Sequence, residues 1–525
     1  MNKINRLIYI IIDNLRSDHL FDFIDRGLLP NFEKLMENGI YSKSCITDFP
    51  PITYPTQVSL LTGTYTGDFR KENCHGVPLM NWMGRDVAPP FLRDYSARNL
   101  QIYKINKDMG KKCQTILEMV EEGNKASISQ FINRGSNYFF PERKTKLAMY
   151  YLTLIYSRNI KKMMIRTDTS LVLKLIETIK KPKKHFQDSE PPIASLLWFP
   201  TPDILLHAFG FNSQIYKLNI LHIDKVIGLL VESLDKMGYL DDTAIAITSD
   251  HGNYKAEKVG QLFEFFKQTN WLKHYHPRKN SKGNLNVAKY DGVGFFNIKG
   301  LVNKKIKNGW THPTIKEMES FGPNKVNLIE ELFKINGSHL MYFRDENNTA
   351  SRGVIHLRKK INESGKIISG AIEYSGNGKE FKTKYIIESD EIDIFDYLKN
   401  ETASKLLDNK FHSIDEWLAA TYHLDYPLYI DLIPRHFKNP RSSDVILSND
   451  GTVVYNFKNG KKGNNNVHNH DLGFRECMAV PLIIGGSLDI PHKEVRFSKV
   501  TDIVPTLLKL LGKTPHKSVV GKSLL

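Results

Sequence analysis

Acidic and histidine side chains recur in this chain shortly after apolar runs. Asp13 follows residues 7–12, LIYIII, and the adjacent Asp250 and His251 come after residues 243–248, TAIAIT. Asp203 comes shortly after SLLWF. Such runs are typical of buried strands, and an α/β sheet builds its site at the carboxyl ends of its strands. Because carboxylates and imidazoles are ligands of Zn²⁺ and Mn²⁺, the pattern predicts a metal centre at this edge of a sheet.

Two of these groups have a spacing that suits metal binding. Asp203 and His207 are four residues apart in TPDILLHAFG, so on a helical turn both side chains face the same side. Asp250 and His251 are neighbours at a strand end and directly precede Gly252. Either pair alone also occurs for structural reasons, so the prediction depends on their order along the chain.

A threonine hydroxyl lies between these groups in the sequence. Thr53 stands in PPITYPTQVSLLTG, just before an expected helix, where backbone N–H groups and the helix dipole favour an anion. A metal ion beside such a hydroxyl lowers its pKa and makes it a nucleophile. The alternative is that Thr53 or Thr56 merely caps the helix. We expect Thr53 to be the nucleophile, and Thr56 to be the cap or a polar group near the phosphate.

A last candidate ligand is one of two histidines near the end of the chain. His468 and His470 are two residues apart, so on an extended segment both side chains project to the same face. We expect only one of them to bind metal. The whole set is rich enough for two metal ions, which together with a hydroxyl nucleophile indicates phosphoryl or sulfuryl ester chemistry.

The elements around these residues alternate between strand and helix. Expected strands are residues 7–12, 100–106, 191–199, 243–248 and 481–486. Expected helices are residues 29–39, 57–63, 215–238 and 502–512. This alternation implies a mostly parallel sheet. By contrast, residues 373–385, EYSGNGKEFKTKY, predict a hairpin within a small β region.

Two long stretches of different character interrupt the sheet-forming segments. We expect a catalytic core in three parts, residues 1–107, 186–255 and 446–525. Residues 108–185 are Lys-rich and predict a mainly helical insertion, whereas residues 256–445 predict an insertion or cap region of mixed α+β structure.

Composition bounds the class of protein. The chain has 525 residues, 41% hydrophobic and 25% charged, which is ordinary for a soluble globular protein. Its net charge of +16 comes from dispersed lysines, and no motif supports nucleic-acid binding. The four cysteines form no C-x-x-C pair, which excludes a zinc ribbon.

No segment has the roughly 20 apolar residues of a membrane span, and the first apolar run is shorter than the apolar region of a usual signal peptide, so we expect a cytoplasmic protein. The oligomeric state stays open.

In their order along the chain, the motifs resemble the alkaline phosphatase superfamily, and within it the type I phosphodiesterase/nucleotide pyrophosphatase family. The resembling segments are IIDNLRSDHL, ITYPTQVSLLTGTYTG, HGVPLMNW, PDILLHAFG, TSDHGN and HNHDLGFRECMAVPLIIGG. The resemblance implies an alkaline-phosphatase-like α/β sandwich. Its central, mostly parallel sheet would be flanked by helices, with insertions that include a small β-rich region.

The resemblance also implies two divalent metal ions, Zn²⁺ or alternatively Mn²⁺. One site would be made by Asp13, Thr53, Asp250 and His251, with Thr53 forming a covalent phospho-enzyme. The other would be made by Asp203, His207 and His470 or His468. Spacing to the RECMAVPLI segment favours His470, whereas the spacing in nucleotide pyrophosphatases favours His468.

Departures from the family pattern bear on the substrate. The family commonly has an Asn after the threonine–aromatic–proline run, where it helps to hold the phosphate, and here Thr56 stands there. Neither late histidine is followed by the usual Gly, and TYPTQ lacks the C/S-x-P-x-R pattern of sulfatases. We expect a metal-dependent hydrolase of phosphate esters, above all of phosphodiester or nucleotide pyrophosphate bonds in nucleotide-like small molecules. The alternatives are a phosphomonoesterase or phosphonate hydrolase of the same superfamily, and a non-catalytic anion- or nucleic-acid-binding protein on this fold.

Overall fold

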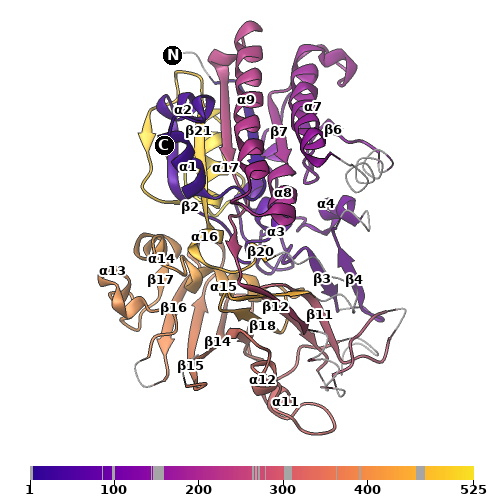
Figure 1. The fold of residues 1–525 in the computed structure, drawn as a ribbon, viewed down its shortest axis with the longest axis vertical. Coiled ribbons are helices and arrows are strands. Elements are labelled where there is room, and N and C mark those ends of the chain that lie inside the picture. The colour runs from indigo at the N-terminus through magenta and orange to yellow at the C-terminus, as the bar shows by residue number, and fades with distance from the viewer. Residues whose placement is uncertain are drawn as a thin grey trace. The chain divides into compact units, whose positions relative to one another are not determined.

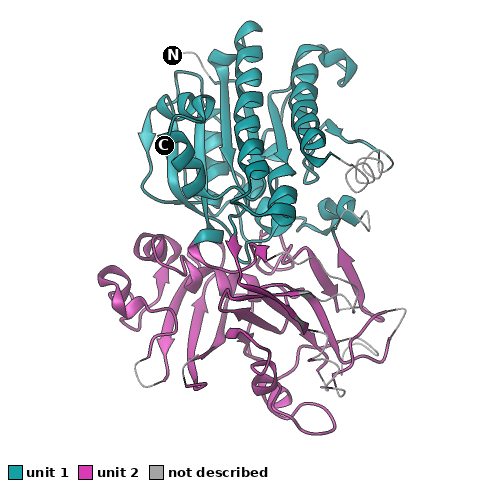
Figure 2. Cartoon of the chain, viewed as in Figure 1, with its two compact units in different colours: residues 1–65, 95–253, 476–525 teal, residues 66–94, 254–475 magenta. Residues whose placement is uncertain are grey.

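The computed structural model divides the chain into two compact units, each with its own sheet (Figure 2). Unit 1 comprises Met1–Tyr65, Tyr95–Asn253 and Glu476–Leu525, and unit 2 comprises Thr66–Asp94 and Tyr254–Arg475. The structure describes residues 4–525 with the exception of residues 86, 97–100, 144, 146–158, 263–264, 266–268, 270–271, 278–279, 301–309, 362–363, 390–391 and 457–466.

Unit 1 is built on a nine-stranded sheet (Figure 1). Its strands are β1 (Arg6–Ile12), β2 (Ile40–Ile46), β5 (Lys125–Ile128), β6 (Tyr138–Phe140), β7 (Ala194–Phe199), β8 (Thr243–Thr248), β21 (Ala479–Gly486), β22 (Lys493–Glu494) and β23 (Ser498–Lys499). They lie in the order β22-β2-β21-β8-β1-β7-β5-β6, with β23 also paired to β2. The run from β8 to β6 is parallel, and β21 is antiparallel to both of its neighbours. The predicted central, mostly parallel sheet is therefore confirmed.

The three central strands end at the same edge of this sheet. In β1, β7 and β8 nearly every residue is buried, as expected of parallel strands covered on both faces. Their register pairs Ile12 with Phe199, and Ile11 with Thr248. The residues that follow these strands consequently meet at one edge.

Helices of unit 1 flank the sheet, and the longest two, α7 and α9, pack against each other (Figure 1). The helices are α1 (Ser17–Asp25), α2 (Pro30–Glu37), α3 (Thr53–Thr62), α4 (Ile105–Asp108), α5 (Ile116–Met119), α7 (Ile160–Lys180), α8 (Thr201–Phe209), α9 (Gln214–Lys236) and α17 (Ile503–Leu510), with α16 (Arg475–Met478) at the unit boundary. Short 3-10 helices cover Gln101–Lys104, Pro182–Lys184, Leu240–Asp242 and Val500–Asp502. The buried residues of α9 recur at helical spacing and join the core beneath the sheet strands.

Two segments of unit 1 differ from the sequence-based expectation. Residues 108–185, expected to be mainly helical, contain α7 but also strands β5 and β6, which extend the central sheet. Both strands are too short to show a strand period in a Lys-rich stretch. Residues 100–106, expected as a strand, form helical turns in their described part. Ile102 and Ile105 are both buried and three residues apart, a spacing that suits a helical turn.

Unit 2 is built on an antiparallel sheet in the order β11-β12-β18-β13-β14-β15-β16-β17. Its strands are β11 (Leu285–Tyr290), β12 (Val293–Ile298), β13 (Ser338–Arg344), β14 (Arg352–Lys360), β15 (Ile367–Ser375), β16 (Lys382–Ile387), β17 (His412–Ser413) and β18 (Val445–Asn449). The expected hairpin is present, because β15 pairs with β16 from Ser375 and Lys382 onward, and Gly376 and Gly378 in the turn have positive φ. Strand β18, expected in the catalytic core, instead lies between β12 and β13.

Smaller elements complete unit 2. Two-stranded sheets pair β3 (Asn81–Gly84) with β4 (Phe91–Asp94), β9 (Tyr254–Lys255) with β20 (His468–Asn469), and β10 (Lys258–Gln261) with β19 (Val453–Asn456). The helices are α11 (Ile315–Glu319), α12 (Leu328–Leu332), α13 (Glu401–Ser404), α14 (Ile414–Thr421) and α15 (Tyr429–Phe437), with 3-10 turns at Gly378–Glu380 and Tyr397–Lys399. A separate core lies between this sheet and α11 and α12.

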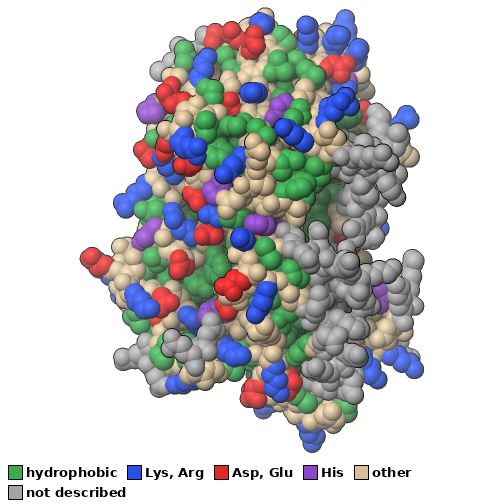
Figure 3. Space-filling model, in the orientation of Figure 1, with side chains coloured by type: hydrophobic (Ala, Val, Ile, Leu, Met, Phe, Trp, Pro, Cys, Tyr) green, Lys and Arg blue, Asp and Glu red, His purple; other side chains and the backbone are tan. Residues whose placement is uncertain are grey.

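The surface and the helices bear on two further expectations. On the face drawn in Figure 3, Lys and Arg side chains are scattered among acidic ones and do not gather in one patch. Among the described residues, no helix combines the length and the apolar character needed to cross a membrane. All four cysteines are buried, and none of the four forms a disulfide bond.

Candidate metal centre

The candidate ligands of unit 1 lie at the carboxyl ends of the central strands. Asp13 directly follows β1, and its backbone N–H donates to the carbonyl of Phe199, the last residue of β7, at 3.0 Å. Asp250 and His251 follow β8, and Asp203 lies in the first turn of α8, which begins just after β7. Three different strands thus deliver these side chains to one place.

Asp13, Asp203 and His251 form a group that could hold a metal ion. One ligand atom from each lies within 4.8 Å of the other two. The Nε2 atom of His251 is 3.5 Å from Oδ1 of Asp13 and 3.8 Å from Oδ1 of Asp250. Asp13, Asp250 and His251 are buried, whereas Asp203 is partly exposed. The two distances from His251 are longer than an ordinary hydrogen bond, as expected if His251, Asp13 and Asp250 bind one cation.

The electrostatics of this group fit the binding of a cation. Burial raises the pKa of Asp13 well above its ordinary value, and the nearby carboxylates of Asp250 and Asp203 raise it further. Burial also raises the pKa of Asp250. Oδ1 of Asp13 is buried and accepts no hydrogen bond from any described residue. Three carboxylates so placed are costly without a positive charge among them, so the donor set fits a divalent metal ion.

Thr53 lies beside this group. Helix α3 begins at Thr53 itself, four residues before the expected start, because Pro55 is tolerated in the first turn of a helix. The hydroxyl Oγ1 of Thr53 is 3.3 Å from Nε2 of His251. The residue at the N-cap position is Ile52, not Thr53. The Thr53 hydroxyl therefore faces the metal-binding group from the positive end of a ten-residue helix.

Thr56 occupies a different environment one turn into α3. Its side chain is fully buried, and its hydroxyl donates to the backbone carbonyls of Ile52 at 2.9 Å and Thr53 at 3.0 Å. Such bonding back along the helix is common for threonine. In this geometry the hydroxyl stabilises the first turn of α3, and a contact of Thr56 with substrate stays a prediction.

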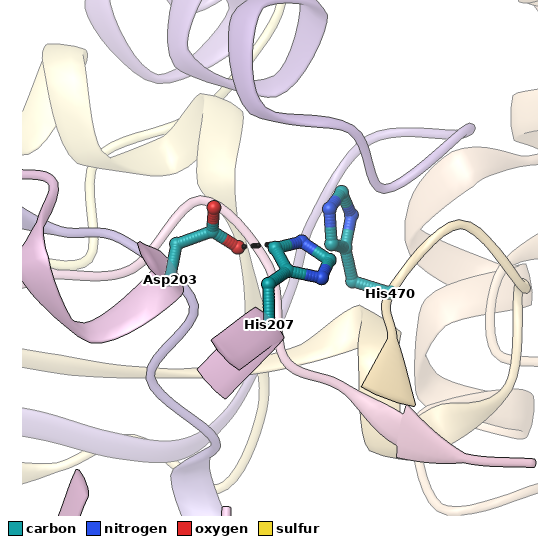
Figure 4. A group of neighbouring side chains, drawn as sticks. All are labelled: Asp203, His207 and His470. Atoms are coloured by element: carbon teal, nitrogen blue, oxygen red, sulfur yellow. Dashed lines mark ion pairs between the residues drawn. The ribbon is translucent and has the colours of Figure 1, made fainter. Parts of the chain in front are cut away.

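Asp203 and His207 lie on one face of α8. Oδ1 of Asp203 is 3.2 Å from Nε2 of His207, the ion pair drawn as a dashed line in Figure 4. Helix α8 has Pro202 in its first turn and ends before Gly210, whose φ of 84° brings the chain out of the helix. Both side chains retain partial exposure, at 20% and 33%, so this pair remains accessible to solvent.

The late histidines belong to unit 2, including His470, the third side chain drawn in Figure 4. His468 lies in β20 and is partly exposed, whereas His470 directly follows β20 and is buried. The chain after His470 is held in place, because the Asp471 carboxylate accepts hydrogen bonds from the backbone of Gly292 and Val293 at 3.0–3.2 Å. Which of the two histidines binds metal stays a prediction.

Two buried amides next to the ligands were not singled out from the sequence. Nε2 of Gln57 donates to Oδ2 of Asp250 at 2.8 Å, and its Oε1 accepts from Nε2 of Gln130 at 3.0 Å. Asn14, directly after Asp13, donates to Asp203 and Asp250. The four-residue spacing between Thr53 and Gln57 places both on one face of α3, and that spacing was the available signal.

The fold and the sequence together define the class of the protein. The model of the type I phosphodiesterase/nucleotide pyrophosphatase family matches residues 7–310, and the chain belongs to this family.

Individual relatives match about half of the chain. An uncharacterized pyrophosphatase/phosphodiesterase of Schizosaccharomyces pombe is 27% identical over 251 residues, 47% of this chain and 44% of that protein. The human bis(5'-adenosyl)-triphosphatase is 22% identical over 261 residues, 47% of each chain. The chain thus spans less than half the length of these curated relatives.

Solved structures match over nearly the whole chain. Murine ectonucleotide pyrophosphatase/phosphodiesterase 5 has a TM-score of 0.55 at 14% identity, over 97% of this chain and 96% of that one. A second structure of the murine protein, an inactive threonine-to-alanine variant in complex with AMP, has a TM-score of 0.55 at 15% identity over the same shares. At this identity the likeness establishes the fold.

Proposed function

We propose that the chain is a two-metal hydrolase of phosphodiester or nucleotide pyrophosphate bonds, with Thr53 as its nucleophile. The observation that carries this proposal is the convergence of Asp13, Asp203 and His251 within 4.8 Å, with the Thr53 hydroxyl 3.3 Å from His251. A nucleophile, buried carboxylates and a helix N-terminus meet at one point. That combination suits attack on an anionic phosphorus centre.

The proposed reaction has two steps. Thr53 loses its hydroxyl proton to solvent, and its Oγ1 bonds to phosphorus as the bond to the leaving oxygen breaks and that oxygen takes up a proton. Water then adds its hydroxyl to phosphorus and its other proton to Thr53, which releases the phosphoryl group. Divalent metal ions, when bound, supply positive charge for the attacking and leaving oxygens. The first turn of α3 lies at the positive end of the helix dipole, which favours the phosphate oxygens.

The chemical types of the candidate ligands favour particular metal ions. Carboxylates with imidazoles bind Zn²⁺, and Mn²⁺ accepts the same oxygen and nitrogen donors. We propose that Asp13, Thr53, Asp250 and His251 serve one ion, and that Asp203 and His207 serve the other. On the sequence spacing we propose His470 as the remaining ligand.

The names of related proteins favour a nucleotide-like substrate. The human relative is named a bis(5'-adenosyl)-triphosphatase, and the murine protein of similar fold was solved with AMP. We propose that this chain acts on the same class of compounds, nucleoside phosphates joined through a diester or an anhydride. A phosphomonoesterase is the alternative that the experiment must separate.

A substrate screen with metal replacement tests the proposal. The purified protein is chelated, checked for metal by elemental analysis, and assayed with bis-p-nitrophenyl phosphate, p-nitrophenyl phosphate and p-nitrophenyl sulfate after addition of Zn²⁺, Mn²⁺ or Mg²⁺. We expect diester hydrolysis that is lost on chelation and regained with Zn²⁺ or Mn²⁺. Faster turnover of the monoester would favour the alternative, and full activity without metal would refute the metal centre.

A further inference from the structure

Asn14 has an unusual backbone conformation for a buried residue. It joins β1 to the segment before α1, it is fully buried, and its φ is 60°. Residues other than glycine rarely adopt this left-handed region, and Asn is among those that tolerate it best. Holding such a conformation costs free energy, so the surrounding contacts must compensate.

The conformation lets one residue reach two of the candidate metal ligands. The backbone N–H of Asn14 donates to Oδ1 of Asp250 at 3.2 Å. The side-chain Nδ2 of Asn14 donates to Oδ1 of Asp203 at 2.7 Å. Asp250 follows β8 and Asp203 follows β7, so Asn14 links carboxylates delivered by the strands on either side of β1.

Asn14 is itself held from two further directions. Its side-chain oxygen accepts from Nδ2 of Asn253 at 2.8 Å, which leaves the amide nitrogen to face Asp203. Its backbone carbonyl accepts from the hydroxyl of Tyr216 at 3.1 Å. Four hydrogen bonds thus fix a residue that has little freedom of its own.

This arrangement counters a repulsion within the site. The carboxylates of Asp13, Asp203 and Asp250 repel one another, and Asp203 is the partly exposed member that has room to turn away. A neutral amide donor holds Asp203 in place without adding charge and without competing for the metal ion. Partners of this kind orient ligands around metal ions in many proteins.

We propose that Asn14 is a positioning residue that holds Asp203 relative to Asp250 and so governs occupancy of the metal site that includes Asp203. The proposal rests on the two-metal function proposed above. In this role Asn14, the residue after Asp13, keeps two ions bound at a fixed separation.

Metal-binding isotherms of two variants test this role. Asn14→Gly keeps the left-handed backbone and its N–H but removes the amide that holds Asp203. Asn409→Gly is the matched control, because Asn409 also has a positive φ, of 63°, and is exposed in unit 2. In equilibrium dialysis against buffered Zn²⁺, we expect wild type and Asn409→Gly to bind two ions. We expect Asn14→Gly to bind one ion normally and the other about 10- to 100-fold more weakly.

Asn14→Asp separates positioning from charge. It keeps the size of the side chain but places a carboxylate oxygen against Asp203 where a donor stood. Added negative charge alone would tighten Zn²⁺ binding, whereas loss of positioning weakens one ion as in Asn14→Gly. Tighter binding in Asn14→Asp, unchanged isotherms in Asn14→Gly, or equal loss of both ions would each overturn the proposal. A wild-type protein that binds no Zn²⁺ would instead refute the metal centre itself.

Discussion

Asp168 is a buried carboxyl group whose ionisation should govern the stability of unit 1. It lies in α7 and accepts hydrogen bonds from the Thr201 hydroxyl and from Nδ2 of Asn219, each at 2.7 Å. Thr201 is the first residue of α8, the helix that carries Asp203. Asp168 therefore links α7 to α8, the helix that carries Asp203, and to α9.

Burial raises the pKa of Asp168 to about 7, against an ordinary value of 3.8, although the two hydrogen bonds lower it. Because the folded pKa lies above the unfolded one, the folded state holds the proton more tightly. The stabilising effect is complete below about pH 4 and is lost as the pH rises through about 7. At 1.36 kcal/mol for each pH unit between the two pKa values, the whole effect is about 4 kcal/mol. About 3 kcal/mol of it falls between pH 5 and pH 8.

Asp168→Asn removes the ionisation and keeps the shape of the side chain. We expect the free energy of unfolding of the variant, relative to wild type, to rise by about 3 kcal/mol from pH 5 to pH 8. Urea titrations at pH 5, 6, 7 and 8 measure this difference, in which the other titrating groups cancel. Asp235→Asn carries the same substitution at an exposed position of α9 and serves as the control. A difference between Asp168→Asn and wild type that stays constant with pH would refute the reasoning.

Three further predictions concern the metal centre. Thr53→Ala should lose about 1 kcal/mol or less of its free energy of unfolding and bind metal nearly normally, but its turnover should fall by several orders of magnitude. Thr53→Ser should keep partial activity. Near-normal turnover of Thr53→Ala would remove Thr53 from the mechanism. His470→Ala should lose one metal ion and most of its turnover while His468→Ala loses less, and elemental analysis showing the reverse would make His468 the ligand. Gln57→Leu removes the donor to Asp250 and should weaken Zn²⁺ binding about 10- to 100-fold in a competition assay with a chelator, and an unchanged affinity would limit Gln57 to packing.

The central sheet could be predicted because its strands are fully buried. Burial on both faces makes β1, β7 and β8 continuous apolar runs, which stand out in the sequence. Strands β5 and β6 have only four and three residues, and pairing with their neighbours decides their conformation. Local pattern could not place β18 either, since its partners β12 and β13 are far from it in the sequence.

The candidate metal ligands could be predicted from the sequence, whereas the residues that hydrogen-bond to them could not. Asp203 and His207 are four residues apart, and in a helix this spacing brings the two side chains close together on one face. The contacts of Asn14 with Asp203 and Asp250 join residues 189 and 236 positions apart. No local pattern encodes such distances, so hydrogen-bond partners of the ligands require the folded structure.

The strand order of unit 1 also determines when its strands can pair during synthesis. Strand β1 is synthesised before both of its neighbours in the sheet, because β7 and β8 follow it by some 190 and 240 residues. Strand β21, which is synthesised after both β2 and β8, lies between these two strands in the sheet. Until then both strands present unpaired backbone edges, which invite association with other chains. A chain truncated before Ala479 should consequently aggregate, and we expect the nascent chain to need shielding of these edges until β21 emerges.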